Sequence, residues 1–236
     1  MKSLLLSSTL IFLLLSANLL HAQNKVKPLK STPDDSKQIE FKKSAAMEDH
    51  NYMMRWDVLV KQTGEKAPDF TIRHLNGKTF TLHEELKKGK PILLINGSYT
   101  CDISRDHIPE VAQLAHKYKK KISVYVVHTV EAHPSDMPSP YSISNEVWLS
   151  KLNVKAGIEA ERPKTYLERR QLTSKWIVFL RIKPKVLVDN PDNTFWNTYG
   201  QAPNMAFLIS PDEIISASQV FFEKEQMKKN IDRLLD

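Results

Sequence analysis

Short apolar runs bounded by turn-forming residues predict a central pair of strands joined by a helix. Residues 92–95 (Ile-Leu-Leu-Ile) follow a Lys-Gly-Lys-Pro turn, which is typical of a strand buried on both faces of a sheet. Apolar positions at helical spacing then predict a helix over residues 102–118. The β-branched run 122–128 predicts a second buried strand. A strand, helix and strand of these lengths form a right-handed parallel crossover.

The pattern before and after this unit extends the same sheet. Asn76-Gly77 between two alternating runs predicts a hairpin over residues 71–82. The whole indicates an α/β fold, a central mixed β-sheet flanked by helices, with an N-terminal hairpin and an insertion after the second central strand. The remaining predicted elements are a helical turn at 83–86, an irregular proline-rich loop at 137–142, an ambiguous stretch at 145–160, a helix at 164–182, a strand at 185–189, a turn-rich loop at 190–197, paired strands at 205–209 and 214–222, and a helix at 223–235.

The first 63 residues differ in character from the rest of the chain. In residues 1–22, Lys2 precedes an almost uncharged leucine-rich stretch, which predicts a secretory signal peptide cleaved after Ala22 and an exported, periplasmic or secreted protein. An uncleaved membrane anchor is the alternative. Residues 23–43 are polar and predict a flexible linker, residues 44–63 predict a helical extension, and residues 64–236 form the folded domain.

Composition narrows the classes of partner. The chain has 236 residues and a net charge of +7, with its densest basic cluster at residues 117–121. Nucleic-acid-binding surfaces more often interleave basic with aromatic residues, so we expect no nucleic-acid partner and interpret this cluster as a solvated helix end. His128 and His133 apart, the histidines form no pair at a familiar metal spacing, so we expect no metal site.

The single cysteine, Cys101, stands where the first central strand passes into a helix. Free N–H groups and the positive end of the helix dipole favour a thiolate there; Arg105 adds to this effect and Asp102 opposes it. The alternative is a buried, inert thiol. Ser98 and Thr100 are placed to donate hydrogen bonds to the sulfur. With no second cysteine, an oxidised Cys101 needs an external thiol or a thioredoxin-type reductant to restore it.

The second strand ends at residues 130–136, Val-Glu-Ala-His-Pro-Ser-Asp. Ligand sites in open α/β sheets gather at the carboxyl ends of the strands, where Cys101 also lies. His133 is the acid/base candidate, because an imidazole exchanges a proton near neutral pH, and Glu131 could orient it. A His-Pro turn is the alternative interpretation, and His128, at the end of the strand, is interpreted as structural.

These segments resemble the iodothyronine deiodinases, thioredoxin-fold reductive dehalogenases whose catalytic residue is selenocysteine. Residues 95–101 (Ile-Asn-Gly-Ser-Tyr-Thr-Cys) match the family's catalytic segment, with Cys101 at the selenocysteine position and Tyr99 in place of a cysteine. Residues 131–136 carry the family's Glu-Ala-His-Pro-Ser-Asp unbroken. The resemblance implies that Pro203 is cis and faces the thiol. Weaker matches lie at residues 167–170, 188–190 and 199–203, so the resemblance extends from about residue 64 to the C-terminus.

Departures from the family pattern concern the substrate. Met205 stands where the family has an arginine that is thought to grip the carboxylate of a thyronine, and Lys164 and His128 replace a family histidine and tyrosine. The resemblance therefore implies a bacterial-type thiol oxidoreductase that attacks an iodinated aromatic, a peroxide or a disulfide. It implies no cofactor beyond the external reductant. A non-catalytic exported binding or scaffold protein is the alternative, and the sequence leaves a homodimer open.

Overall fold

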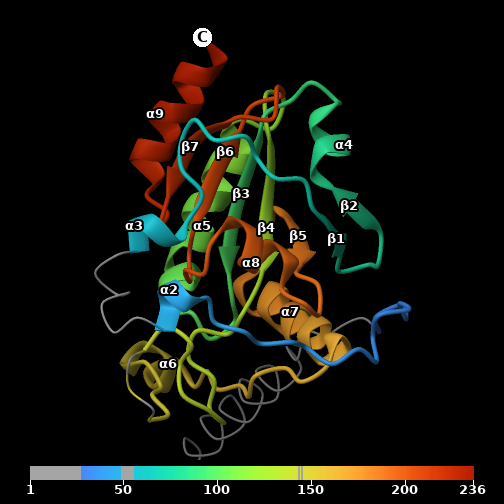
Figure 1. Cartoon of the computed structure of the whole chain (residues 1–236), viewed down its shortest axis with the longest axis vertical. Helices are drawn as coiled ribbons and strands as arrows, with labels where there is room; N and C mark the ends of the chain where they lie inside the picture. The colour runs from blue at the N-terminus through green and yellow to red at the C-terminus, as the bar shows by residue number, and fades with distance from the viewer. Residues whose placement is uncertain (1–27, 49–55, 143, 145) are drawn as a thin grey trace, which may run out of the picture.

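The computed structural model describes residues 28–48, 56–142, 144 and 146–236, and its centre is a seven-stranded mixed sheet (Figure 1). The strand order is β2-β1-β5-β4-β3-β6-β7. Strands β3, β4 and β5 run parallel, and the flanking pairs are antiparallel. The predicted mixed sheet and parallel crossover are confirmed. The strands are β1 (Thr71–His74), β2 (Thr79–Thr81), β3 (Ile92–Gly97), β4 (Ser123–His128), β5 (Lys185–Val188), β6 (Ala206–Ile209) and β7 (Ile215–Gln219).

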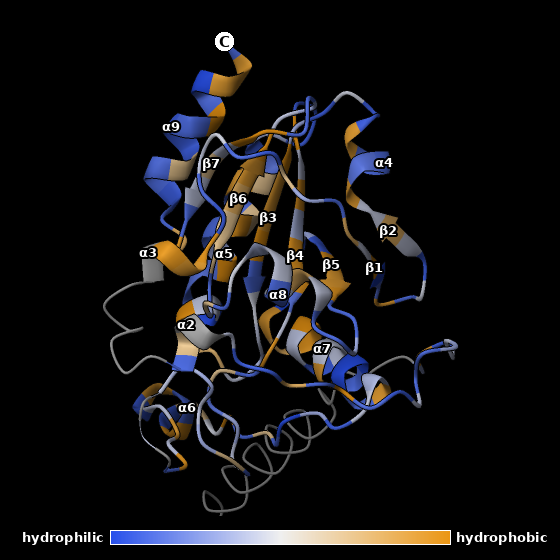
Figure 2. Cartoon of the chain, viewed as in Figure 1, coloured by the Kyte–Doolittle hydropathy of each residue, from blue (hydrophilic) through white to orange (hydrophobic). Residues whose placement is uncertain are grey.

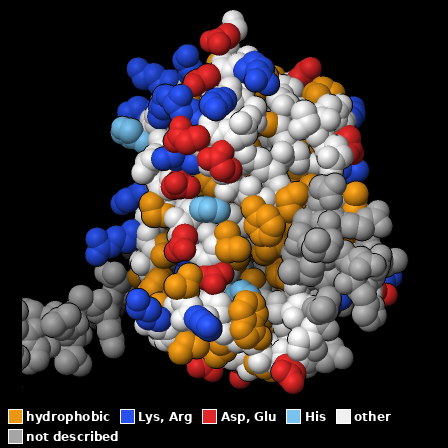
Figure 3. Space-filling view, turned by 90° about the vertical axis from the view of Figure 1, so that its left-hand side faces the viewer, with side chains coloured by type: hydrophobic (Ala, Val, Ile, Leu, Met, Phe, Trp, Pro, Cys, Tyr) orange, Lys and Arg blue, Asp and Glu red, His pale blue; other side chains and the backbone are white. Residues whose placement is uncertain are grey.

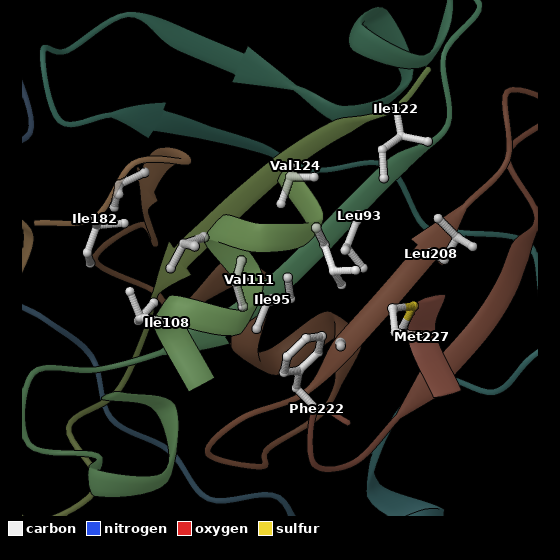
Figure 4. Packing of buried hydrophobic residues seen from close by; sticks show 14 of the residues in the cluster. Leu93, Ile95, Ile108, Val111, Ile122, Val124, Ile182, Leu208, Phe222 and Met227 are labelled. Carbon is white, nitrogen blue, oxygen red and sulfur yellow. The ribbon is translucent and has the colours of Figure 1, made fainter. Parts of the chain in front are cut away.

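Alternation along β3 explains why its whole run is apolar. Leu93 and Ile95 pack into one core and Ile92 and Leu94 into another on the opposite face, because successive side chains of a strand point to opposite faces. Figure 4 shows Leu93 and Ile95 beside Val111 of helix α5. In Figure 2 strands β3 and β6 are hydrophobic, whereas α9 displays mainly hydrophilic residues. The helices are α2 (Ala45–Glu48), α3 (Trp56–Leu59), α4 (Leu82–Leu86), α5 (Asp102–Lys117), α6 (Lys151–Ala156), α7 (Tyr166–Leu180), α8 (Thr194–Tyr199) and α9 (Lys224–Leu235).

Most helix boundaries follow local signals. Thr165 and Glu168 form a capping box at the start of α7, and Arg181 in the left-handed region ends that helix. Helix α6, within the stretch that the sequence left ambiguous, is capped by the Ser150 hydroxyl and ended by Gly157 at φ 63°. The loop predicted over residues 190–197 is wrong in its second half, where α8 forms.

The N-terminus of helix α8 is capped by a side chain that the local sequence pattern did not reveal. The Asp189 carboxylate, at the end of β5, accepts hydrogen bonds from the backbone N–H groups of Phe195 and Trp196 at 2.8 and 3.0 Å. These are among the N–H groups that a helix start leaves without an intrahelical partner. A carboxylate from the preceding strand supplies the cap that Asn193 does not make with its own side chain.

Residues 28–48 do not behave as the flexible linker expected over residues 23–43. Buried Arg170 pairs with Asp35 at 2.6 Å and donates to the carbonyl groups of Lys30 and Leu75. The backbone N–H groups of Ile39 and Glu40 donate to the carbonyl groups of Lys164 and Pro191. Charged contacts and backbone pairing thus hold this polar segment, which we call the strap (residues 28–48), against the domain.

The N-terminal segments were predicted to hold a signal peptide and a helical extension. The helical extension predicted over residues 44–63 contains α2 and α3, and residues 49–55 between them lie outside the described residues. The signal peptide predicted at residues 1–22 also lies outside them. Within the described part of the chain, every helix is too short or too polar to cross a bilayer.

Candidate active site

Three segments far apart in the sequence meet at the carboxyl ends of the parallel strands. Gly97, the last residue of β3, is the parallel partner of His128, the last residue of β4. The side-chain amide of Asn96 donates to the Thr129 hydroxyl at 3.1 Å and to the Ala202 carbonyl at 3.0 Å, and its oxygen accepts from the backbone of Met205. Asn96 therefore ties the ends of β3 and β4 to the segment that enters β6.

Cys101 is the N-cap of α5, as its position at a strand-to-helix corner predicted. Its Sγ accepts a hydrogen bond from the Ser104 backbone N–H at 3.4 Å, and its thiol donates to the Pro203 carbonyl at 3.8 Å. Gly97 lets Ser104 of α5 pack closely against the end of β3, because a Cβ on residue 97 would lie 2.6 Å from the Ser104 Cβ. The sulfur thus lies between the first turn of α5 and Pro203, in the segment that leads into β6.

The thiol is buried in a cluster of residues from distant segments. Cys101 is only 1% exposed and packs in one apolar cluster with Met47 of the strap, Tyr141 of the insertion and Trp196 of α8. Trp196 stacks on Phe41 and donates its indole N–H to the Tyr141 hydroxyl at 2.9 Å. The cover is therefore assembled from segments that share no sequence neighbourhood with Cys101.

This cover changes the ionisation expected for the thiol. Burial raises the pKa of Cys101 to about 11, and this effect outweighs the hydrogen bonds from Ser104 that lower it. The nearby carboxylates Asp102 and Glu131 raise it further. The expectation of a thiolate is wrong for this covered conformation, because the helix N-terminus supplies less stabilisation than the loss of water removes.

Alkylation of Cys101 by iodoacetamide should therefore continue to accelerate with pH up to about pH 11. Only the thiolate reacts, so the rate should rise about tenfold per pH unit below the pKa. The rate is measured by mass spectrometry of the folded chain, with the chain unfolded in urea as control. The control should level off near the ordinary value of 9.0. A plateau of the folded chain below pH 9 would contradict the dominance of burial.

Glu131 is the centre of a buried polar network. Its carboxylate accepts from the backbone N–H and the hydroxyl of Thr100 at 2.8 and 2.6 Å, and from the backbone N–H of Tyr99 at 3.4 Å. His128 Nε2 lies 2.7 Å from its other side. Burial acts to raise the pKa of Glu131, but the hydrogen bonds from His128 and Thr100 outweigh it and hold the pKa below its ordinary value. Glu131 thus fixes the loop that precedes Cys101.

Both ring nitrogens of His128 lie within hydrogen-bond distance of a buried partner. His128 Nδ1 is 2.5 Å from the Thr173 hydroxyl, which donates to the Arg169 carbonyl at 2.7 Å. Nε2 faces the Glu131 carboxylate. The side chains of His128 and Glu131 are both 0% exposed. Glu131 therefore orients His128, in contrast to the expectation that it would orient His133.

His133 lies beside the residue that follows Cys101. Its Nε2 is 3.8 Å from Asp102 Oδ1, and its ring packs edge-on against Trp148 with centroids 4.5 Å apart. The nearby His133 is the largest of the causes that hold the pKa of Asp102 well below its ordinary range. Within the described residues, buried Nδ1 of His133 has no hydrogen-bond partner. The imidazole is thus close to the start of α5, and its contacts lead to Asp102.

The residues predicted to support Cys101 lie in or beside the loop before it, but their contacts differ from those expected. Among the described residues the hydrogen-bond partners of the sulfur are Ser104 and Pro203, not Thr100 or Ser98. The Thr100 hydroxyl donates to Glu131, and the Ser98 hydroxyl accepts from the Ala132 N–H. Arg105 is buried and donates to the Tyr99 carbonyl at 3.3 Å. Tyr99 itself packs in the core on the α7 side.

Pro203 and Met205 complete the comparison with the family pattern. The described chain contains no cis peptide bond, so Pro203 is trans, unlike the isomer that the resemblance implies. Its carbonyl nevertheless faces the thiol. Met205 is fully buried in the core on the opposite sheet face, so no cation replaces the family's arginine at this position.

Sequence reasoning missed the sulfur's actual donor and its cover. Ser104 was not singled out, although a backbone N–H three residues after an N-cap is the usual partner of a capping side chain. The apolar character of Tyr141 and Trp196 gave no indication that they meet over Cys101, since their positions depend on the tertiary fold.

Comparisons with known proteins agree with this geometry at the level of the fold. No family model matches the chain. A thioredoxin-like protein of Bacillus subtilis, YneN, is 27% identical over 112 residues, which are 45% of this chain; the chain spans only 65% of that relative's length.

The similar solved structures belong to the same fold class. A thiol-disulfide oxidoreductase from Bacteroides fragilis has a TM-score of 0.50 at 15% identity and covers 72% of this chain and 100% of its own. The thioredoxin domain of a thiol-disulfide oxidoreductase from Bacteroides vulgatus has a TM-score of 0.49 at 16% identity, with 75% and 99% coverage. With its strand order and Cys101 at a strand-to-helix corner, the chain has a thioredoxin-like α/β fold.

Proposed function

We propose that the protein is an exported thiol-disulfide oxidoreductase with Cys101 as its nucleophile. The observation that carries this proposal is the placement of Sγ at the first turn of α5, 3.4 Å from the Ser104 N–H, at the carboxyl ends of the parallel strands of a thioredoxin-like sheet. Export is supported by the leucine-rich residues 1–22. Glu131 acts as a positioning residue through Thr100, and His133 is the nearby proton donor.

The chemistry begins when the cover over the sulfur opens. Movement of Met47 and Tyr141 would restore water to Cys101 while leaving the Ser104 N–H, which belongs to α5 itself, in place. The burial that raises the pKa would then be removed, and the stabilising donor would remain. The covered state protects the thiol, and the open state exposes a thiolate.

The open thiolate attacks one sulfur of a substrate disulfide R–S–S–R′. A Cys101–S–S–R bond forms, the substrate S–S bond breaks, and R′S⁻ leaves and takes up a proton. An external dithiol then attacks the R sulfur, which releases Cys101 as thiolate. Its second thiolate displaces RSH and closes a disulfide within the reductant. The substrate disulfide is reduced and the dithiol is oxidised, as the absence of a second cysteine requires.

An iodinated aromatic is the second substrate class, suggested by residues 131–136 and 95–101. There the thiolate would take up the iodine as a sulfenyl iodide while a proton is delivered to the ring carbon. One external thiol would then release iodide and form a mixed disulfide, and a second thiol would regenerate Cys101. Buried Met205 offers no charge to a substrate carboxylate, which favours substrates without one.

The complete cover of Cys101 also favours a second candidate function, a non-catalytic binding domain that keeps its thiol in the core. The two candidates are separated by offering the full chain and a dithiol a protein disulfide, an iodinated phenol and hydrogen peroxide in parallel. The proposed function predicts turnover of the disulfide above the uncatalysed rate. No turnover of any substrate would favour the binding domain.

Replacing Met47 by Ala should accelerate alkylation of Cys101 at neutral pH by about tenfold. The substitution removes most of the strap side chain that packs in the cluster around the sulfur, so a reagent reaches the thiol without a large opening. Alkylation by iodoacetamide is followed by mass spectrometry. Met227→Ala, in the separate core beneath α9, is the control for general loosening. Equal acceleration in both variants would mean that exposure requires global unfolding.

A further inference from the structure

The end of the sheet opposite Cys101 is formed by three loops that contain only basic charges. They precede β3, β4 and β5, and the parallel register of these strands brings the three loops to one end of the sheet. No Asp or Glu occurs within residues 87–91, 117–122 and 181–185. The basic residues of these loops, which we call the basic end, are Lys87, Lys88, Lys90, Lys117, Lys119, Lys120, Lys121, Arg181, Lys183 and Lys185, and all are exposed.

Few of these charges are neutralised. Lys87 and Lys88 pair with Glu84 and Glu85 of α4. Lys117 lies near Asp232 of α9, where it helps to lower the pKa of that carboxyl after the larger effects of Tyr118 and Lys228. The other members of the basic end make no ion pair with a described residue. Most of the positive charge is therefore available to a partner.

The charges that neighbour the basic end differ between its β1 side and its β6 side. On the β1 side, Lys185 and Lys78 lower the pKa of His74, although burial is the larger cause. On the β6 side, Glu213 follows the end of β6 and is already paired with Lys66 and His83. Figure 3 shows Lys and Arg side chains gathered near the upper end, where α9 and the C-terminus lie, with Asp and Glu among them. The three loops before β3, β4 and β5 therefore carry only basic charges, and the acidic residues lie on the flanking α4 and α9 and in the turn between β6 and β7.

We propose that the basic end docks the protein reversibly on a membrane surface rich in anionic lipids. Nine of its ten basic residues are lysines, which attract headgroup charge without demanding a fixed geometry. Tyr118 and Tyr125, which lie within and beside these loops, are buried and offer no ring for base stacking, whereas Phe179, two residues before Arg181, is 50% exposed. The leucine-rich residues 1–22 also direct the chain to or across a membrane. These observations favour lipid over nucleic acid as the polyanion.

Docking in this way sets the orientation of the molecule. Cys101 follows the carboxyl end of β3, whereas the basic end lies at its amino end, so the thiol faces away from the bound membrane. A substrate in solution could then reach the site while the domain stays at the lipid surface. The proposal does not depend on the chemistry proposed for Cys101, and the two can fail separately.

The experiment measures binding of the full chain to vesicles by flotation. Phosphatidylcholine vesicles give the background from residues 1–22, and vesicles with about one third phosphatidylglycerol give the electrostatic contribution. The test variant carries Lys120→Gln, Lys121→Gln and Lys183→Gln. The matched control carries Lys151→Gln, Lys155→Gln and Lys164→Gln, which are exposed at the Cys101 end. Both variants lose the same net charge.

The test variant should lose on the order of a hundredfold in affinity for the anionic vesicles, since each lysine near the surface contributes about fivefold. The control should lose no more than about twofold, because its lysines lie beyond a screening length from the docked surface. Binding of the unmodified chain should also fall when salt is raised from about 0.05 to about 0.5 M. Equal losses in both variants, no preference for anionic vesicles, or tighter binding to duplex DNA than to vesicles would each overturn the proposal.

Discussion

Replacing Cys101 by Ser is expected to remove dithiol-dependent turnover of a protein disulfide, with a loss of at least about a thousandfold. Cys101 is the only sulfur that can form the mixed disulfide, and a serine hydroxyl does not ionise at neutral pH. Turnover is measured as oxidation of the dithiol above the uncatalysed rate. The chain without the substitution should also yield one mixed-disulfide adduct by mass spectrometry.

The fold of this variant provides the control. A serine hydroxyl can accept the Ser104 N–H in place of Sγ, so the helix cap should survive and the melting temperature should change by only a few degrees. Met205→Leu, a volume-conserving change in the opposite core, serves as a second control that leaves the sulfur in place. Full turnover in the folded Cys101→Ser variant would show that the thiol is not the nucleophile.

Replacing Glu131 by Ala should destabilise the protein by about 3–5 kcal/mol, the cost of leaving several buried polar groups without their hydrogen-bond partner. The substitution removes the carboxylate that His128 and both donors of Thr100 contact in a region that is fully buried. For a domain of this size the melting temperature should fall by about 6–20 °C. The measurement is thermal unfolding followed by circular dichroism. Cys101 should also react faster, because the loop before it loses its fixed point.

Two further variants make this result interpretable. Glu84→Ala removes a carboxylate whose side chain is 67% exposed and should change the free energy of unfolding by no more than about 0.5 kcal/mol. Glu131→Gln keeps one oxygen acceptor and should lie between Ala and the unchanged chain. If Glu131→Ala melts like Glu84→Ala, the network around Glu131 contributes little, and the proposed positioning of the Cys101 loop is wrong.

Much of the fold could be predicted because its signals are local. The apolar run of β3, the Asn-Gly turn of the first hairpin and the apolar positions of α5 each lie within a few residues, and their elements formed as expected. The same is true of Cys101, whose place at a strand-to-helix corner needs only the strand before it and the helix after it. Helix α8 was missed because its cap, Asp189, directly follows β5 and lies five residues before the helix starts.

In the candidate site, too, local signals identified the residues but did not reveal their contacts. Residue types and spacing pointed to Cys101, Glu131 and His133, but contacts across the fold decided what each one touches. Glu131 contacts His128, not His133, because the end of β4 and the loop after it bring the side chains of Glu131 and His128 together in the interior.

The amino-acid sequence by itself determined the thioredoxin-like sheet and the position of the single thiol, since these follow from local pattern and from residue identity. Only the tertiary structure decided that Met47, Tyr141 and Trp196 share one buried cluster with Cys101 and that three separate loops form one basic end. The physical reason is that burial and clustered charge arise from distant segments packed together, and desolvation by those segments outweighs the local helix terminus at Cys101.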